Sequence, residues 1–497
     1  MNYSVNLVYL EKMIQDKLRE LEQSSSKLNS NLTERSHLQQ AAIEYANRFY
    51  ESQPEEKAYR EFNESVKNLL NEPIDEEAGE VEVILRELEN GVVRPGLNTV
   101  SGRHFGYIPG GGLASSAIGD FLAAVTNRYA GVYASSPGAV VVETRLINWM
   151  SDLVGYGEGS GGYLSSGGSH ANLTALVTAR DSAELKAADY SKAVIYLTQQ
   201  THHCVDRALN IAGMKESKRR YIPMDDRFRM IPSELVRSIE QDRNDGLIPW
   251  VVVASAGSTD TGAIDPLDKI GGIARENGLW YHVDAAYGGF FILTDDGKEK
   301  LKGIEKSDSV VMDPHKGLFL PYGTGALIVK DVKKLAEAHR FSANYMKDAD
   351  VKSGIYSPAE ISPELSKHFR GLRMWLPLKL HGVKRFRDAL EEKQLLARYL
   401  WEKMKTVDDI EVGPEPQLSI FMFRWNPESG ESNVLNRELH KSLLKEGRFF
   451  LSTTEVDGRF FFRVAILSVR THQREVDELL STIQEKIKVI KPNDGSA

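Results

Sequence analysis

The sequence has little cysteine, no excess of basic charge and no long apolar run, and each shortage excludes a class of protein. Its 497 residues include one cysteine, Cys204, so no intramolecular disulfide can form, which fits a reducing compartment. The net charge of -8 argues against a nucleic-acid or anionic-membrane partner, because such partners require a basic surface. No uncharged apolar stretch reaches membrane-spanning length, and the first residues lack an export signal. These features predict a soluble cytoplasmic protein.

Apolar residues divide the chain into three predicted parts. Residues 1–114 form an N-terminal helical segment, because leucine and isoleucine recur at helical spacing from Leu7 to Leu21. These stripes have little core of their own, so we expect the segment to pack on another subunit or on the main domain. Residues 115–378 alternate apolar runs with helical patterns, which predicts a large α/β domain, and residues 379–497 predict a small α+β domain.

The large domain is predicted to contain a mostly parallel central sheet flanked by helices. Its expected strands are continuous apolar runs, as in sheets buried on both faces: residues 193–197, 250–255, 279–284, 309–313 and 325–329. In the small domain, an alternating run over 418–425 predicts a strand, and two runs flanking Asp457-Gly458 predict a hairpin. Ligands of parallel sheets bind at the carboxyl ends of the strands, so we expect the site there.

A Gly/Ser-rich stretch, SSGGSHAN over residues 165–172, opens a long helical segment. Small residues let a backbone approach a phosphate closely, and a helix start supplies unpaired amides. Alone, the stretch is also typical of a plain turn capped by Ser169. Just upstream, Gly157, Gly159 and Gly162 match the dinucleotide fingerprint, but a predicted helix precedes them where that fingerprint needs a strand. We therefore reject the dinucleotide interpretation.

Two further clusters follow predicted strands. Asp284 ends an apolar run, and the small residues of 285–289, Ala286 among them, leave room for a flat ring beside its carboxylate. Lys316 follows the next run. Alone, an aspartate there is usually a cap and a lysine is usually a surface residue. Together, the three clusters supply a phosphate cradle, a carboxylate for a pyridine nitrogen and an imine-forming amine. Pyridoxal 5'-phosphate requires all three.

These clusters resemble the motifs of the group II pyridoxal-phosphate-dependent decarboxylases, the family of aromatic-L-amino-acid, histidine and glutamate decarboxylases. The resemblance runs from about residue 100 to the C-terminus. It rests on HFGYIPGGG (104–112), SSGGSHANLTAL (165–176), QTHHCVDRAL (200–209), HVDAAYGG (282–289) and DPHKG (313–317). It implies the aspartate-aminotransferase-like fold type I of pyridoxal-phosphate enzymes, and a homodimer with the site at its interface.

Together with the clusters, the resemblance defines the expected site. The catalytic residues are Lys316, His202, Tyr345 and Asp284. The cofactor-binding residues are Gly168, Ser169, His202, Thr259, Asp265, Asp284, Ala286, Asp313, His315 and Lys316. A substrate-pocket segment comprises Tyr107, Ile108 and Pro109. No metal site is expected. His202 matches a histidine that stacks on the cofactor ring, and Tyr345 matches a loop tyrosine that reprotonates the substrate Cα.

The implied reaction is decarboxylation of an L-amino acid to its amine and carbon dioxide. An apolar, aromatic segment over 104–112 favours an aromatic amino acid ahead of acidic or diamino acids. An aldehyde-forming decarboxylase of the same fold is an alternative, although Tyr345 favours the simple reaction because that branch has phenylalanine there. A transaminase would clamp the substrate carboxylate with an arginine such as Arg463 or Arg470. A non-catalytic relative would lack Lys316 or Asp284.

Overall fold

The computed structural model describes residues 2–340, 354–428 and 431–490. The chain forms two compact units: unit 1 comprises Met1–Glu56 and Arg60–Gly96, and unit 2 comprises Lys57–Tyr59 and Leu97–Ala497. Each unit is described by itself.

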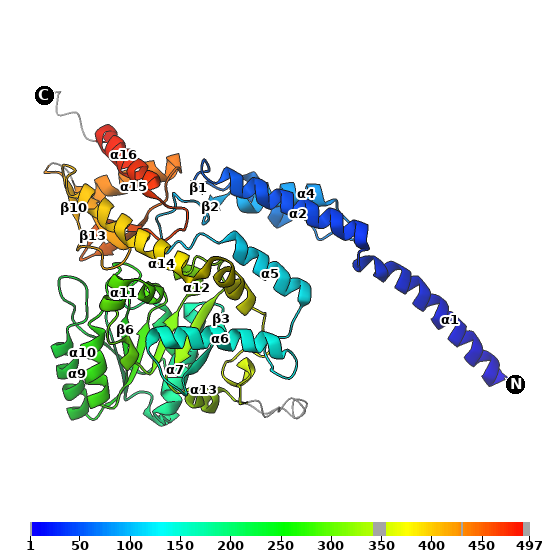
Figure 1. The fold of residues 1–497 in the computed structure, drawn as a ribbon, viewed down its shortest axis with the longest axis horizontal. Coiled ribbons are helices and arrows are strands. Elements are labelled where there is room, and N and C mark those ends of the chain that lie inside the picture. The colour runs from blue at the N-terminus through cyan, green and yellow to red at the C-terminus, as the bar shows by residue number, and fades with distance from the viewer. Residues whose placement is uncertain (1, 341–353, 429–430, 491–497) are drawn as a thin grey trace. The chain divides into compact units, whose positions relative to one another are not determined.

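Unit 1 is helical (Figure 1). Its elements are α1 (Asn2–Ser25), η1 (Ser26–Leu28), α2 (Leu32–Ser52), α3 (Glu64–Asn71), α4 (Val81–Glu87) and η2 (Leu88–Val93). The predicted stripe from Leu7 to Leu21 lies on α1, and its five residues are 47% to 59% exposed. Asn31 begins α2 with a capping box, since its side chain accepts a hydrogen bond from the N–H of Glu34. The predicted N-terminal helix is therefore confirmed.

Unit 2 is built on a seven-stranded sheet with the order β3-β9-β8-β7-β6-β4-β5. Its strands are β3 (Gly161–Ser165), β4 (Ala193–Leu197), β5 (Lys218–Tyr221), β6 (Ile248–Ser255), β7 (Trp280–Asp284), β8 (Ser309–Met312) and β9 (Gly325–Val329). Strands β8, β7, β6, β4 and β5 run parallel, and β9 is antiparallel to both β8 and β3. The mostly parallel sheet is therefore confirmed, and each predicted apolar run is a strand.

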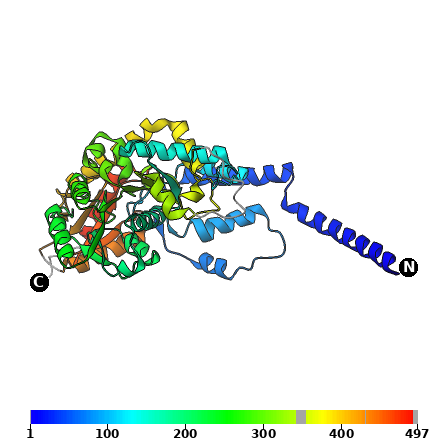
Figure 2. The same cartoon turned by 90° about the horizontal axis from the view of Figure 1, so that it is seen from below.

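Helices cover the central sheet in both views (Figure 1, Figure 2). They include α6 (Pro137–Val154), α7 (Gly168–Ser182), α8 (Cys204–Ile211), α9 (Pro232–Asn244), α10 (Leu267–Glu276) and α13 (Val332–His339). Every residue of β4, β7, β8 and β9 is buried, as expected for a sheet covered on both faces. Helix α6 occupies the place upstream of Gly157 where a dinucleotide fingerprint needs a strand, so the rejection of that motif is confirmed.

A second sheet of unit 2 is antiparallel, with the order β10-β11-β13-β12, and has its own hydrophobic core. Its strands are β10 (Ile410–Val412), β11 (Ile420–Trp425), β12 (Ser452–Val456) and β13 (Arg459–Ala465), and the accompanying helices are α14 (Gly371–Met404), α15 (Ser432–Glu446) and α16 (Gln473–Ile490). The predicted hairpin is confirmed, because Asp457 and Gly458 turn between β12 and β13 with positive φ. The strand predicted over 418–425 is confirmed as β11, and all six of its residues are buried because it is an inner strand.

The topology gathers several strand ends at one edge of the central sheet. The parallel strands β6, β7 and β8 end at Ser255, Asp284 and Met312, and Ser255 pairs with Asp284 in register. Because β3 shares their direction, helix α7 begins at the same edge, as does α12 (Pro314–Gly317) after β8. In the described part of the chain, no helix has the length and apolar character that crossing a lipid bilayer demands.

Candidate active site

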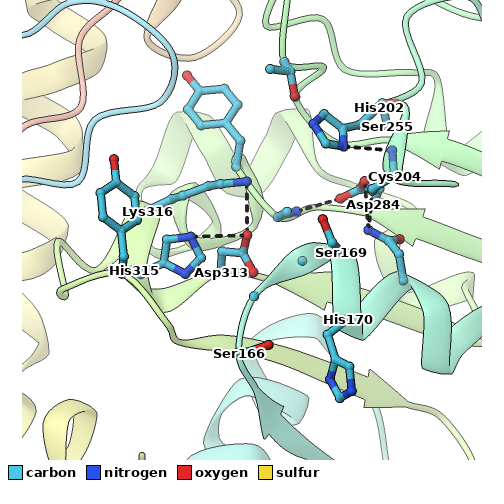
Figure 3. A pocket seen from close by; sticks show the side chains of 18 of the residues that line it. Ser166, Ser169, His170, His202, Cys204, Ser255, Asp284, Asp313, His315 and Lys316 are labelled. Carbon is cyan, nitrogen blue, oxygen red and sulfur yellow. Dashed lines mark hydrogen bonds and ion pairs between the residues drawn. The ribbon is translucent and has the colours of Figure 1, made fainter. Parts of the chain in front are cut away.

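A cavity of about 370 Å³ lies at this edge of the central sheet (Figure 3). It brings together most of the residues expected from the sequence: Gly168, Ser169, His202, Thr259, Asp284, Ala286, Asp313, His315 and Lys316. Lys316 and Asp313 lie on one side of the cavity, and Asp284 and Cys204 lie on the other. Tyr345 falls outside the described residues.

The start of helix α7 lies at the predicted phosphate cradle and lines the cavity. Its N-cap is Gly167, with φ 155° and ψ 173°, a conformation that is nearly exclusive to glycine. No side chain caps this helix start, which differs from the alternative of a turn capped by Ser169. Among the described residues, none accepts a hydrogen bond from the N–H of Gly168 or Ser169. A Cβ on Gly168 would lie 2.9 Å from Asp313 Oδ2, so the close approach requires glycine.

Asp284 sits at the end of β7 and is 9% exposed. Its Oδ1 accepts a hydrogen bond from the N–H of Ala286 at 3.1 Å, and its Oδ2 accepts one from Nδ2 of Asn172 at 3.2 Å. The same Nδ2 donates to Sγ of Cys204 at 3.4 Å. Two neutral donors, the side-chain amide of Asn172 and the N–H of Ala286, therefore fix this carboxylate, which also lines the cavity. A carboxylate held in this way suits a protonated ring nitrogen.

Sequence reasoning missed Asn172 and Cys204 as members of the site. Asn172 lies four residues after Gly168, one helical turn into α7, so the helical period could have placed it on the cavity side. Cys204 begins α8 two residues after His202. Its position next to the predicted residue His202 could be recognised in the sequence, but a single thiol gives no indication that its side chain lines a cavity.

Lys316 and Asp313 form an ion pair on the other side of the cavity, with 3.0 Å between Nζ and Oδ2. His315 Nε2 lies 3.7 Å from the same oxygen, and its Nδ1 donates to the carbonyl of Thr324 at 2.6 Å. Burial alone would lower the pKa of Lys316, but the nearby carboxylates of Asp313 and Asp284 outweigh it and raise the pKa above its ordinary value.

His202 lines the cavity beside His203, with 4.1 Å between the ring centroids. Its Nδ1 accepts a hydrogen bond from the N–H of Cys204 at 3.2 Å, so the ring proton of the neutral imidazole is on Nε2. Burial lowers the pKa of His202, which favours this neutral form.

Other predicted residues lie outside the cavity lining. Asp265 is buried and accepts hydrogen bonds from the N–H groups of Met230 at 2.7 Å and Ser255 at 2.8 Å, which fixes the end of β6. Burial raises the pKa of Asp265 to about 6. In the 107–109 segment, Tyr107 is 59% exposed, whereas Ile108 and Pro109 are buried.

The two arginines considered as carboxylate clamps are bound to backbone. Arg463 donates from Nε to the carbonyl of Asp260 at 2.8 Å and from another nitrogen to the carbonyl of Thr259. Arg470 donates to the carbonyls of Gly111 and Gly112. Both therefore hold loops of unit 2, and neither lines the cavity.

The fold and the site together define a class of enzyme. Free amides, a buried acceptor carboxylate and an amine converge on one cavity, and this set of groups fits pyridoxal 5'-phosphate. Residues 64–426 match the family model of the pyridoxal-dependent decarboxylase conserved domain.

Known relatives agree with this match. The aromatic-L-amino-acid decarboxylase of Bacillus atrophaeus is 34% identical over 436 residues, which cover 86% of this chain and 90% of that protein. The 4-hydroxyphenylacetaldehyde synthase of Rhodiola rosea is 28% identical over 424 residues, 82% of this chain and 86% of that protein. The crystal structure of Oryza sativa TDC with PLP and tryptamine has the same fold, with a TM-score of 0.88 at 24% identity, over 93% of this chain and 99% of that one.

The chain belongs to the group II pyridoxal-phosphate-dependent decarboxylase family. It is a carboxy-lyase that acts on an amino acid, and its cofactor is pyridoxal 5'-phosphate. When bound, this cofactor withdraws the electron pair that the departing carboxyl group leaves on Cα.

Proposed function

We propose that this enzyme decarboxylates an aromatic L-amino acid to the corresponding amine and carbon dioxide. The observation that carries the choice of substrate is the charge of the cavity. Lys316 is the only lysine or arginine among the described residues that line it, and we assign this amine to the cofactor. An acidic substrate would need a further cation for its side-chain carboxylate. The 34% identity to an aromatic-L-amino-acid decarboxylase supports the same choice.

Three side chains of the cavity have distinct roles in this proposal. Lys316 would hold the cofactor through its amine. Asp284, held by its two neutral donors, would accept a hydrogen bond from the protonated ring nitrogen. His202, with its proton on Nε2, would be a hydrogen-bond donor in the same cavity. The start of α7 holds the phosphate through the amides of Gly168 and Ser169.

A substrate screen tests the proposal. The purified holoenzyme is supplied with tryptophan, tyrosine or phenylalanine and, in parallel, with glutamate or ornithine, and both carbon dioxide and amine are measured. We expect release from at least one aromatic amino acid, without any keto acid, and only background release from the Lys316→Ala variant. Faster turnover of glutamate or ornithine would overturn the choice of substrate.

Amine is the product we propose, and Tyr345 is the basis for it. Aldehyde formation is the specific alternative, because one relative is a 4-hydroxyphenylacetaldehyde synthase. We assign to Tyr345 the return of a proton to Cα, as the sequence resemblance implies. In the Tyr345→Phe variant, dissolved dioxygen and water should then react in place of Cα protonation, so that aldehyde, ammonia and hydrogen peroxide are released instead of amine. A variant that still gives amine alone would contradict this role.

We further propose that the enzyme is a homodimer in the cytoplasm. Helix α5 (Ala114–Thr126) of unit 2 supports the dimer, because Ile118, Phe121, Leu122 and Val125 form one stripe at helical spacing and are 39% to 62% exposed. A second copy would cover this stripe. Sedimentation equilibrium should show a dimer for the wild type and dissociation for Phe121→Asp. The single cysteine supports the location.

A further inference from the structure

A continuous chain of hydrogen bonds runs through the core of unit 2 and ends at Asp284. The indole N–H of Trp280 donates to Oγ of Ser309 at 2.8 Å. Ser309 Oγ lies 2.8 Å from Nδ1 of His282, and His282 Nε2 lies 2.7 Å from Oδ1 of Asn172. Asn172 Nδ2 then donates to Asp284 Oδ2 at 3.2 Å. We propose that Asn172 and His282 are positioning residues that keep the carboxylate of Asp284 oriented toward the cofactor.

The two ends of this chain fix the direction of every bond in it. An indole nitrogen only donates, and a carboxylate only accepts. At the Asp284 end, the amide of Asn172 must therefore present its NH₂ group to the carboxylate and its oxygen to His282. His282 must then carry its proton on Nε2, so its Nδ1 accepts a hydrogen bond from the hydroxyl of Ser309. That hydroxyl oxygen in turn accepts from Trp280, and each group has one role.

Burial makes this arrangement rigid and keeps it uncharged. Asn172, His282 and Ser309 are each 0% exposed, and Trp280 is 7% exposed. Burial lowers the pKa of His282 to about 4, so its ring is neutral at neutral pH. A neutral histidine with one defined tautomer can accept from Ser309 and donate to Asn172 at the same time. A flipped Asn172 would place its oxygen against the carboxylate and break both of its bonds.

The hydrogen-bond chain reaches the cavity at Asn172 and Asp284, both of which line it. A charge-assisted hydrogen bond from a protonated ring nitrogen to Asp284 requires the carboxylate to face that nitrogen. The donor from Asn172 also fixes the plane of the carboxylate relative to the cavity. Neither Trp280, His282 nor Ser309 lines the cavity, so their influence passes through Asn172. The inference rests on the cofactor site described above, and it does not depend on which amino acid is decarboxylated.

Three variants test the chain, and two of them form a matched pair. Asn172→Leu removes the donor to Asp284, and His282→Leu removes the partner that orients Asn172. His282→Gln keeps a donor amide near the position of Nε2 and an acceptor oxygen. Each apoprotein is titrated with pyridoxal 5'-phosphate, the cofactor's visible absorbance is followed against pH, and kcat and KM are measured separately.

We expect both leucine variants to raise the cofactor's dissociation constant about 10- to 100-fold, the range for one hydrogen bond to a charged group. Their absorbance should change with pH at a different midpoint, and kcat should fall more than KM rises. His282→Gln should recover most of the cofactor affinity. Thermal unfolding of the apoproteins separates this effect from damage to the core.

Two results would overturn the proposal. One is wild-type cofactor affinity and kcat in both folded leucine variants, and the other is equal impairment of His282→Gln and His282→Leu. If the leucine variants do not fold, Ser309→Ala replaces them, since it removes the hydroxyl that selects the tautomer of His282. The Ser309→Ala variant should bind the cofactor several-fold more weakly than His282→Gln does. Equal cofactor affinities of these two variants would refute the proposed role of the hydrogen-bond chain. Because the titration uses no substrate, a wrong substrate assignment leaves this test intact.

Discussion

Two buried aspartates in the cavity, Asp284 and Asp313, follow neighbouring parallel strands but have opposite surroundings. Asp284 faces neutral donors, the amide of Asn172 and the N–H of Ala286. Asp313 is 1% exposed and faces the ammonium group of Lys316 at 3.0 Å. The same residue type at neighbouring strand ends therefore has two different environments. One carboxylate remains available to a ligand, whereas the other balances the charge of the lysine.

This difference shows why position at a strand end is not enough to assign a role. The fold delivers both carboxylates to the cavity, but their partners decide what each can do. Neutral donors leave Asp284 with its negative charge directed into the cavity. The charge of Asp313 is balanced by the ammonium group of Lys316, so Asp313 attracts another cation only weakly. It raises the pKa of Lys316 instead.

Replacement of each aspartate by asparagine should give the largest contrast. Asp284→Asn removes the negative charge from the ring-nitrogen position, so kcat should fall about 100- to 1000-fold, as for loss of one preorganised electrostatic contact. Asp313→Asn should reduce kcat much less. Steady-state assays of both holoenzymes check this order, and a larger loss in Asp313→Asn would reverse the assignment.

The pH dependence of cofactor loading should show a second contrast. Asp313 is the larger of the two carboxylate influences that raise the pKa of Lys316, so Asp313→Asn should lower that pKa. Only the neutral amine attacks the cofactor's aldehyde. Apoenzyme of this variant should therefore load several-fold faster than wild type near neutral pH, with its rate profile displaced to lower pH. Stopped-flow absorbance measures the profile, for which Asp284→Asn is the control with a smaller displacement.

Stability against acid gives the smallest expected effect. The pKa of His282 is about 4 in the folded chain and near 6.5 when unfolded, so the unfolded state binds more protons between these values. Stability from neutral His282 is thus complete above pH 6.5 and declines as the pH falls toward 4, by at most about 3 kcal/mol. Urea unfolding of apoprotein from pH 7 to 4.5 should show a shallower decline for His282→Gln. Parallel curves would contradict a buried neutral His282.

Much of the fold follows from the sequence because the inner strands are continuous apolar runs. Strands β4, β6 and β8 could be located in this way, since burial on both faces favours apolar residues in their centres, and β7 could be located although it carries the buried His282. Strand β5 was missed because its residues, KRRY, are polar and form an exposed edge. Strand β3 was missed because it contains Gly161 and Gly162, which have low strand propensity. The antiparallel direction of β9 depends on pairing, which apolar runs do not specify.

Some residues of the candidate site could also be predicted from the sequence, and others could not. Asp284 and Lys316 could be predicted because they lie at the ends of predicted strands, and the Gly/Ser-rich stretch could be predicted because it opens a long helix. The hydrogen-bond chain behind Asp284 could not, since it joins α7, β7 and β8 across more than a hundred residues of sequence. Asp265 was placed near the cofactor from resemblance, whereas its observed contacts are with the backbone of Met230 and Ser255. Hydrogen bonds from a side chain to backbone groups cannot be predicted from the amino-acid sequence, because every residue type except proline has the same N–H group.

Cys204 lines the cavity and can be used as a site for chemical labelling. It is the chain's sole thiol, it is 3% exposed, and burial raises its pKa, so alkylating reagents should react with it slowly. One adduct per chain then reports one opened cavity, and the mass increase on reaction counts accessible sites without any engineered tag. The Sγ of Cys204 accepts a hydrogen bond from the side-chain amide of Asn172, which also donates to Asp284. A bulky adduct on Cys204 would therefore displace that amide, and the visible absorbance of the bound cofactor should fall as the thiol is modified.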